Sequence, residues 1–351
     1  MSAAAHRSRV PRSASGSPAS RRPRGLKVVA LGGGTGLPVV LRSLKRAIAA
    51  SGGTLTGIVT VTDDGGSSGR LRRAYDVLPM GDIRNCLVAL SENEPLMSRL
   101  FQYRYRGRDG LGGHTVGNLI LTALADSTRS YLRAIETSGE VLAIRGRILP
   151  ATLRNVALVA RCSDGKMLRG ETRVSQSHAP ITLVMTDPPQ PPPAPGVLQA
   201  LREADLIILG PGSLFTSVVP NLLVRGVARV IARARAPRVL VGNLMTQPGE
   251  TDDFTAAAHL AALTRLAGAR VVDYYLSNSR PISRALRQRY ATDGAVPVEM
   301  DRKALVALGA AAVERDLLRE DRRHARIRHH EGKLGRALLR LARRPAARAA
   351  A

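Results

Sequence analysis

Several residue types are scarce in this 351-residue sequence, and each scarcity excludes a class of protein. Tryptophan is absent and the other aromatic residues make up only 3% of the chain, which counts against stacking of single-stranded nucleic acid. The two cysteines, Cys86 and Cys162, are far apart and form no C-x-x-C pair, so neither a disulfide framework nor the usual zinc spacing is present. No apolar run reaches the roughly 20 residues of a membrane-spanning helix, and the basic N-terminus lacks the apolar region of a signal peptide. We therefore expect a cytoplasmic protein without a membrane span.

Acidic residues are also few, and the formal net charge is +26. Almost all of the positive charge comes from arginine, because the chain has only five lysines. The excess is concentrated at the two ends, and the abundance of Arg together with Ala indicates a GC-rich coding bias. Binding of nucleic acid by the basic ends is accordingly kept only as a third hypothesis.

The order of apolar segments predicts the domain organisation. Residues 1–25 contain no Asp or Glu and are predicted to be a disordered basic tail. Residues 26–330 alternate apolar strands with helices, which predicts a Rossmann-like α/β domain with a mostly parallel sheet and helices on both faces. Short strands over about 131–187 predict a β-rich insertion. Residues 331–351 form a basic tail or helix whose leucines face the core or a partner: Leu334, Leu338 and Leu341.

Two glycine-rich turns follow predicted strands. The strand of Lys27–Pro38, KVVALGGGTGLP, ends in Gly33-Gly34-Thr35-Gly36 before a predicted helix over 37–50. Glycines let the backbone approach an anion closely, and a helix N-terminus offers free N–H groups to it. The dinucleotide fingerprint fails because Leu37 stands at its third glycine position, which argues against a dehydrogenase. The alternative is that the turn only packs a strand against a helix. A second such turn has the sequence Gly210-Pro211-Gly212-Ser213.

The strongest chemical signal is the stretch after the second strand. Asp63 and Asp64 stand at its predicted carboxyl edge, where carboxylates bind ribose hydroxyls, hold a divalent metal, act as a base or only cap a helix. Flexible backbone, two hydroxyls and a guanidinium follow directly and suit phosphate oxygens. These groups are Gly65, Gly66, Ser67, Ser68, Gly69 and Arg70.

Polar residues at further turns extend the predicted site. Asp82 is placed to cap the helix that continues through Leu90, and Asn85 follows it. His114 is either a donor or general base for a ligand, or a residue that stabilises its turn. Asn118 follows that turn, and Asn243 follows the strand predicted over 238–241.

The motifs GGGTGLP, VTDDGGSSGRLR, GDIRN, GHTVGNL, RGRILP, GPGSLFTS, PNLLV and NLMTQPGET resemble, in this order, those of the bacterial gluconeogenesis factor family. That family is related to the 2-phospho-L-lactate transferase of coenzyme F420 synthesis. The resemblance covers residues 26–330 and implies a Rossmann-like fold, a cytoplasmic location, binding of UDP-N-acetylglucosamine and a role in cell shape during gluconeogenic growth. It also implies roles for Tyr290 and Arg328, in stacking on uracil or touching the sugar and in contacting a phosphate.

The predicted nucleotide-sugar site is carried over motif by motif. Its members are Gly33, Gly34, Thr35, Gly36, Asp63, Asp64, Ser67, Ser68, Gly69, Arg70, Asp82, Asn85, His114, Asn118, Gly210, Pro211, Gly212, Ser213, Asn243, Tyr290 and Arg328.

The resemblance leaves two leading hypotheses. The first is a regulator that binds UDP-N-acetylglucosamine, needs no cofactor and acts on cell-wall precursor supply through an enzyme of amino-sugar synthesis. The second is a phosphotransferase or nucleotidyltransferase that uses Asp63 or Asp64 with a metal such as Mg²⁺. A homo-oligomer is compatible with both, and the sequence identifies no catalytic residue.

Overall fold

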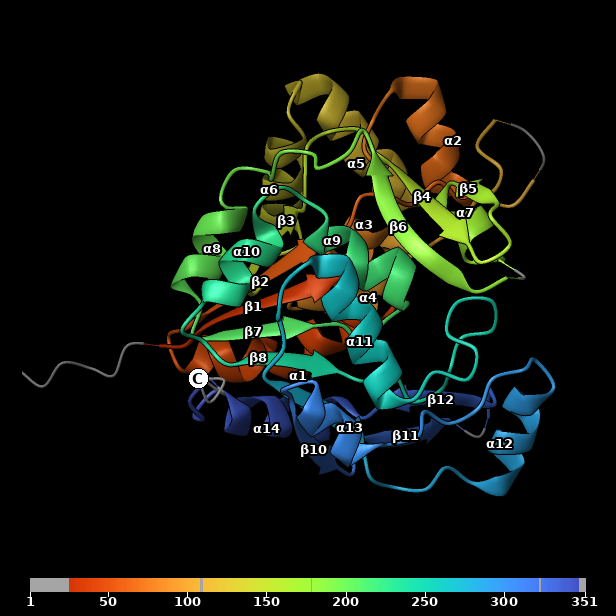
Figure 1. Cartoon of the computed structure of the whole chain (residues 1–351). Coiled ribbons are helices and arrows are strands. Elements are labelled where there is room, and N and C mark those ends of the chain that lie inside the picture. Colours follow the sequence, from red (N-terminus) through yellow and green to blue (C-terminus); the bar gives the residue numbers. More distant parts are fainter. Residues whose placement is uncertain (1–24, 108–109, 178, 322, 347–351) are drawn as a thin grey trace, which may run out of the picture.

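Seven parallel strands form the centre of the computed structural model, which describes residues 25–107, 110–177, 179–321 and 323–346 (Figure 1). Their order across the sheet is β10-β9-β8-β7-β1-β2-β3, and every neighbouring pair is parallel. The predicted tail over 1–25 lies outside the described residues except for its last one. The strands are β1 (Lys27–Gly32), β2 (Thr54–Val59), β3 (Arg147–Pro150), β7 (Leu206–Leu209), β8 (Arg238–Val241), β9 (Tyr274–Asn278) and β10 (Ala311–Arg315).

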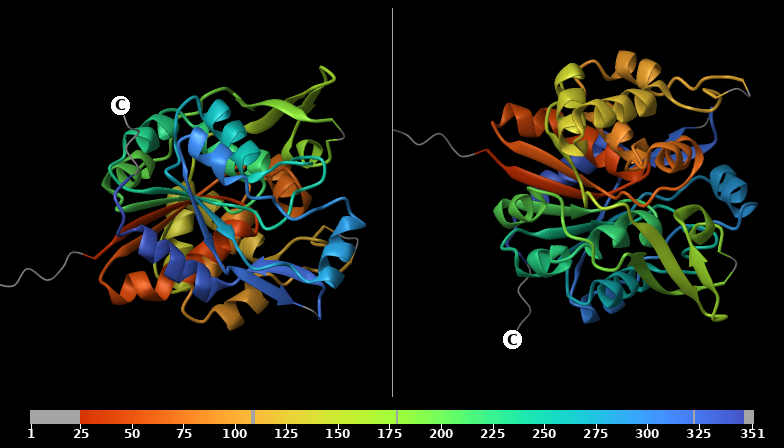
Figure 2. Two further views of the ribbon diagram at one scale, coloured as in Figure 1. Left: turned by 60° about the horizontal axis from the view of Figure 1, so that its bottom comes forward. Right: turned by 90° about the horizontal axis from the view of Figure 1, so that it is seen from above.

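Helices cover both faces of this sheet, as Figure 2 shows. Strand β1 is therefore buried on both sides from Val28 to Gly32, which explains its continuous apolar sequence. The prediction of a Rossmann-like α/β fold is confirmed. One face carries α1 (Gly36–Ala50), α3 (Gly81–Leu90), α4 (Glu94–Phe101), α5 (Val116–Thr128), α6 (Tyr131–Val141) and α14 (Glu331–Leu341). The other carries α8 (Val197–Glu203), η1 (Leu214–Val218), α9 (Val219–Leu222), α10 (Val227–Arg233), α11 (Ala256–Ala267) and α13 (Arg302–Ala307).

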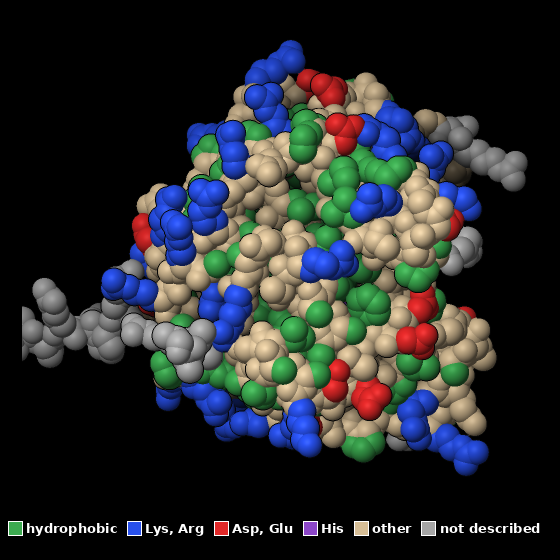
Figure 3. Space-filling view, in the orientation of Figure 1, with side chains coloured by type: hydrophobic (Ala, Val, Ile, Leu, Met, Phe, Trp, Pro, Cys, Tyr) green, Lys and Arg blue, Asp and Glu red, His purple; other side chains and the backbone are tan. Residues whose placement is uncertain are grey.

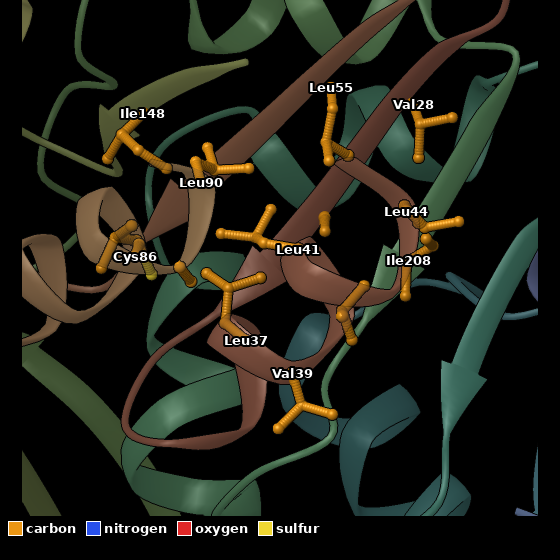
Figure 4. Packing of buried hydrophobic residues seen from close by; sticks show 14 of the residues in the cluster. Val28, Leu37, Val39, Leu41, Leu44, Leu55, Cys86, Leu90, Ile148 and Ile208 are labelled. Atoms are coloured by element: carbon orange, nitrogen blue, oxygen red, sulfur yellow. The ribbon is translucent and has the colours of Figure 1, made fainter. Parts of the chain in front are cut away.

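Helix α1 is the centre of the first core cluster. Leu37, Leu41 and Leu44 pack toward the sheet and the neighbouring helix α3, where the free thiol Cys86 is buried among them (Figure 4). Helix α14 packs on the outer side of α1, and a Cβ at Gly335 would lie only 2.2 Å from the carbonyl oxygen of Ser43. The three leucines of α14, Leu334, Leu338 and Leu341, are buried and thus face the core.

The predicted β-rich insertion is shorter than expected. Residues 131–141 form α6, whose N-cap Ser130 accepts a hydrogen bond from the backbone N–H of Arg133, and β3 joins the main sheet beside β2. Buried positions at helical spacing, such as Ala134 and Ser138, explain why this part is not a strand. The antiparallel sheet itself consists of β4 (Ala157–Cys162), β5 (Met167–Arg169) and β6 (Ile181–Asp187). Its first hairpin turns at Asp164-Gly165, with Gly165 at a φ of +82°.

The remaining elements lie at the periphery of the sheet. They are α2 (Gly66–Tyr75), α7 (Glu171–Val174), α12 (Arg284–Ala291) and the antiparallel pair β11 (Leu318–Asp321) and β12 (Arg326–His329). Within the described residues no single helix is long and apolar enough to cross a membrane, although the bent pair 214–222 and 227–233 reaches that length and composition together. On the face shown in Figure 3, Lys and Arg side chains are spread around the surface and form no continuous stripe.

The strand order determines where a ligand can enter. From β1 the chain adds β2 and β3 toward one edge of the sheet, and it then returns to add β7, β8, β9 and β10 toward the other edge. Strand β1 leads into α1 on one face, and β7 leads into η1 on the other. Open parallel sheets bind ligands in the crevice that such a reversal leaves at the carboxyl ends of the strands.

Candidate functional site

A cleft of about 420 Å³ lies at this position, and we call it the carboxyl-edge cleft. It is formed by the turns after β1, β7 and β8, and β12 and the end of α12 complete it. Its principal lining residues are Gly33, Gly34, Thr35, Gly36, Pro211, Gly212, Ser213, Ser217, Asn243, Leu244, Met245, Thr246, Gln247, Tyr290, Arg326, Ile327, Arg328 and His329.

Backbone rather than side chains forms the floor of the carboxyl-edge cleft. A Cβ at Gly36 would lie 1.9 Å from the carbonyl oxygen of Pro211, so the turns after β1 and β7 touch only because residue 36 is glycine. Asn243 holds the second turn from both sides: its Oδ1 accepts from the backbone N–H of Gly212 at 3.0 Å, and its Nδ2 donates to the carbonyl of Gly212 at 2.9 Å. Gln247 donates to Ser213 Oγ at 2.7 Å. The cleft is therefore preformed.

The side chains at the mouth of the cleft make it electropositive. Arg326 and Arg328 are exposed on β12, and the described lining residues include no Asp or Glu. Tyr290 attaches α12 to this strand, because its hydroxyl accepts from the backbone N–H of Ile327 at 3.1 Å. His329 does not add to the charge: burial lowers its pKa to about 4, and its Nε2 contacts the carbonyl of Gly242 at 3.2 Å.

A second group of predicted residues forms a buried chain of hydrogen bonds beside the cleft, which we call the His114 network. Arg84 donates to Asn118 Oδ1 at 2.9 Å, and Asn118 Nδ2 donates to Ser67 Oγ at 3.1 Å. The hydroxyl oxygen of Ser67 is in turn 3.0 Å from Nδ1 of His114, within hydrogen-bond distance. Burial, with the cations Arg70 and Arg104, lowers the pKa of His114. Burial and the neighbouring cations therefore favour the neutral form of this imidazole.

Carboxylates gather between the network and the cleft. Asp82 does not cap α3, contrary to the sequence prediction: the N-cap residue is Met80, and Asp82 Oδ2 instead accepts from the backbone N–H of Gly34 at 2.7 Å. Burial raises the pKa of Asp82 to about 6. Glu171, bonded to Thr62 Oγ1, has a pKa well above its usual value because of burial and the nearby charges of Asp82 and Asp63. Protonatable carboxyls therefore lie under the turn after β1.

The adjacent carboxylates Asp63 and Asp64 point to different places. Asp63 Oδ1 accepts from the N–H of Gly65, whereas Asp64 Oδ1 is bound by both the N–H and the hydroxyl of Thr172 in α7. Asp64 lines a separate groove with Arg72, on the insertion side of α2. Within the described ranges, no group of three or more His, Cys, Asp or Glu is arranged to hold a metal ion.

The structure thus divides the predicted site into parts. The cleft collects Gly33, Gly34, Thr35, Gly36, Pro211, Gly212, Ser213, Asn243, Tyr290 and Arg328. The network region collects Asp63, Ser67, Ser68, Asp82, Asn85, His114 and Asn118, which hydrogen bonds or neighbouring charges connect. Arg70 is exposed at its rim and donates to the carbonyl of Gly112. Gly69 lines the Asp64 groove.

Sequence reasoning missed several residues of the site. Arg84 lies in the GDIRN motif and Gln247 in NLMTQ, so both stood in stretches that had been singled out. Arg326 is two residues from Arg328, and because both lie on strand β12 they share one side of it. Glu171 gave no signal, since only the folding of the insertion brings α7 to β2.

Comparison with known proteins gives relatives over most of the chain. The family model of 2-phospho-L-lactate transferase CofD matches residues 28–318. Gluconeogenesis factor of Halalkalibacterium halodurans is 43% identical over 312 residues, 89% of this chain and 95% of that protein. Gluconeogenesis factor of Bacillus subtilis is 42% identical over 302 residues, 84% of this chain and 94% of that protein.

A solved structure has the same fold. The crystal structure of a Bacillus halodurans protein superposes with a TM-score of 0.86 at 42% sequence identity, covering 90% of this chain and 100% of that one.

Proposed function

Since the chain belongs to the family of 2-phospho-L-lactate transferase CofD and the gluconeogenesis factors, we propose that it binds UDP-N-acetylglucosamine and regulates cell-wall precursor supply in the cytoplasm. The observation that carries the ligand assignment is the carboxyl-edge cleft, where backbone turns meet Arg326 and Arg328 without any acidic lining residue among those described. A diphosphate suits such a surface, because guanidinium groups bind phosphate oxygens bidentately and glycine turns let oxygens approach backbone N–H groups.

The base and the sugar of the ligand can each be assigned a contact in the cleft. The ring of Tyr290 is half-buried at the cleft and offers a stacking surface for uracil. Hydroxyls of the sugar are matched by polar side chains that line the cleft, such as Ser213 and Gln247.

Calorimetric titration of the full chain with UDP-N-acetylglucosamine tests this assignment. Arg328→Met should weaken binding by about tenfold, as expected for loss of one charge-assisted phosphate contact. Arg319→Met is the matched control, because Arg319 stands opposite Arg328 in the β11–β12 register and does not line the cleft. Equal losses of affinity in the two variants would show that Arg328 acts only through the net charge of the protein. Absence of saturable binding would contradict UDP-N-acetylglucosamine as the ligand. UDP, N-acetylglucosamine 1-phosphate and GDP in the same titration define the specificity.

The regulatory role is tested in cells. A strain that lacks the protein should lose normal shape when it grows on a gluconeogenic carbon source, and the wild-type chain but not Arg328→Met should restore it. Co-purification of the wild-type chain with an enzyme of amino-sugar synthesis would identify the partner, and cell fractionation would test the cytoplasmic location. Normal shape of the deletion strain on such carbon sources would contradict this role.

A transferase is the second candidate, favoured by the match to the 2-phospho-L-lactate transferase model. Asp63 and Asp82 each keep one carboxylate oxygen without a hydrogen bond from the described residues. Magnesium is usually bound by one or two carboxylates together with substrate phosphates, so these residues fit an Mg²⁺ ion that arrives with a nucleotide. Incubation with Mg²⁺, nucleotide donors and phosphorylated acceptors should then yield nucleoside mono- or diphosphate, and Asp63→Asn should abolish its formation. No turnover with any donor would contradict the transferase and leave nucleotide-sugar binding as the proposed function.

A further inference from the structure

A second cavity, of about 560 Å³, lies at the opposite edge of the sheet, and we call it the amino-edge cavity. It surrounds the first residues of β1, β2 and β3 and reaches α8, and it shares no lining residue with the carboxyl-edge cleft. In Figure 1 these strand ends lie on the left, and the turns of the cleft lie on the right. A volume of this size is within the range of small-molecule sites.

The register of the parallel strands places a row of side chains along one wall of the cavity. Val29 pairs with Thr56, and Thr56 pairs with Arg147. Residues in register on parallel strands point to the same face of a sheet, and Val29 packs in the cluster on the α8 face. The hydroxyl of Thr56 and the guanidinium of Arg147 therefore lie side by side beneath α8.

These two polar groups have no other task in the described part of the chain. The Thr56 residue is only 8% exposed, and its hydroxyl, which has no hydrogen-bond partner there, is open to the cavity. Arg147 has neither an ion pair nor a side-chain hydrogen bond within the same residues. Its terminal nitrogens lie 3.3 Å from where a Cβ of Gly196 would be, so the guanidinium is held against the start of α8.

The other charged groups of the cavity are already paired. Lys27 binds Glu203, Arg145 binds Glu92, and Lys45 binds Glu94. One guanidinium with one adjacent hydroxyl therefore remains for a ligand, which suits a singly charged carboxylate better than a phosphate dianion. Val29 and Ala200 offer apolar contact next to these groups.

We propose that the amino-edge cavity binds a small organic carboxylate, with its carboxylate on Arg147 and Thr56 and its apolar part against Val29 and Ala200. This site is separate from the proposed nucleotide-sugar site and does not depend on it. Strands β1 and β2 run from this cavity to the turns of the network and the cleft.

Ligand-observed NMR titration of the full chain with sodium hexanoate tests the proposal, with 1-hexanol as the uncharged match. Hexanoate should bind saturably, and Arg147→Met should weaken it by about tenfold or more, since a charge-assisted bidentate contact is lost. Thr56→Val, which keeps the shape of the side chain, should weaken it about three- to tenfold through the loss of one hydrogen bond. Arg145→Met is the control, because Arg145 lines the same cavity but is bound to Glu92; hexanoate affinity should be unchanged.

Several results would overturn the proposal. They are the absence of saturable binding, equal affinity for hexanoate and 1-hexanol, unchanged affinity in both Arg147→Met and Thr56→Val, and displacement of hexanoate by UDP-N-acetylglucosamine. Tight binding of inorganic phosphate in place of hexanoate would overturn the carboxylate as ligand class. Thermal unfolding of each variant establishes that it is folded, and a failure of nucleotide-sugar binding in wild type would leave this result unaffected.

Discussion

The carboxyl-edge cleft and the His114 network lie next to each other but are built in opposite ways. The cleft is an open surface of glycine turns with exposed arginines, and its shape depends on close backbone contact. The network is a closed chain of buried side chains, and its order depends on which atom donates to which. Asp82 lies between them, where it accepts from the backbone N–H of Gly34 and is close enough to Arg84 to feel its charge.

This difference indicates a division of labour. An open, electropositive backbone surface binds an anion without needing any particular protonation state. A buried hydrogen-bonded chain that includes a histidine of lowered pKa, with carboxyls of raised pKa nearby, can orient hydroxyls or move a proton, provided that every member keeps its partner. We therefore expect substitutions in the network to act mainly on stability, and substitutions in the cleft to act mainly on affinity.

The largest effect is expected from breaking the network at its centre. Asn118→Ala removes two buried hydrogen bonds, one of them to the charged guanidinium of Arg84, and should lower the free energy of unfolding by about 3 kcal/mol. Denaturant titration measures this loss. The affinity for UDP-N-acetylglucosamine should stay within about threefold of wild type, because Asn118 does not line the cleft.

Asn155→Ala is the control for that variant, because the amide of Asn155 is exposed and binds only the exposed Asp76. It should change the stability by less than about 0.5 kcal/mol. A large loss of affinity in the folded Asn118→Ala protein would show that the network and the cleft form a single binding site.

The next largest effect tests a carboxyl that supports the cleft. Burial raises the pKa of Glu250 from 4.5 to about 7, and Thr216 donates to its Oε1. Because the pKa of Glu250 is higher in the folded than in the unfolded chain, its contribution to stability is greatest below pH 4.5. This contribution is lost as the pH rises through about 7. The shift corresponds to about 3 kcal/mol at most. At pH 8, Glu250→Gln should therefore have a free energy of unfolding about 2 kcal/mol higher than wild type, measured by denaturant titration. At pH 4 this difference should disappear.

Glu140→Gln serves as its control, because Glu140 is exposed on α6 and should follow the wild type at both pH values. An equal advantage of Glu250→Gln at pH 4 and pH 8 would show that ionisation is not the cause.

A smaller effect is expected for the clamp on the turn after β7. Asn243→Ala removes both hydrogen bonds to the backbone of Gly212 and should cost about 1.5 kcal/mol of stability. UDP-N-acetylglucosamine should bind about fivefold more weakly, since the loosened turn must be ordered on binding. Denaturant titration measures the loss of stability, and calorimetric titration measures the loss of affinity. A loss of affinity with unchanged stability would instead make Asn243 a direct ligand contact.

The smallest effect should come from Asp64→Asn. One oxygen remains to accept from Thr172, so the stability should change by less than about 0.5 kcal/mol and the nucleotide-sugar affinity by less than about twofold. Asp63→Asn is the comparison, because Asp63 faces Asp82 and should alter the pH dependence of stability. Equal effects of the two variants on the pH dependence of stability would contradict the divergence of these neighbours.

Much of the fold follows from local sequence pattern. The continuous apolar segments before Gly33 and Gly210 require burial on both faces, and this alone predicts parallel strands covered by helices. The glycine turns then fall at the carboxyl ends of those strands because a helix follows the first of them directly. The β-rich insertion was predicted to begin at about residue 131, whereas residues 131–141 form helix α6.

The positions of single side chains were decided by tertiary structure. Asp82 has the sequence position of a helix cap, but the packing of α3 under β1 brings it to Gly34 and gives it another partner. Asp63 and Asp64 diverge because only the folded insertion supplies Thr172 to the second of them. Likewise, Thr56 and Arg147 meet through the register of β2 and β3. The sequence determined the sheet and its turns, because burial and backbone freedom are local properties; which polar atoms meet depends on contacts between segments far apart in the chain.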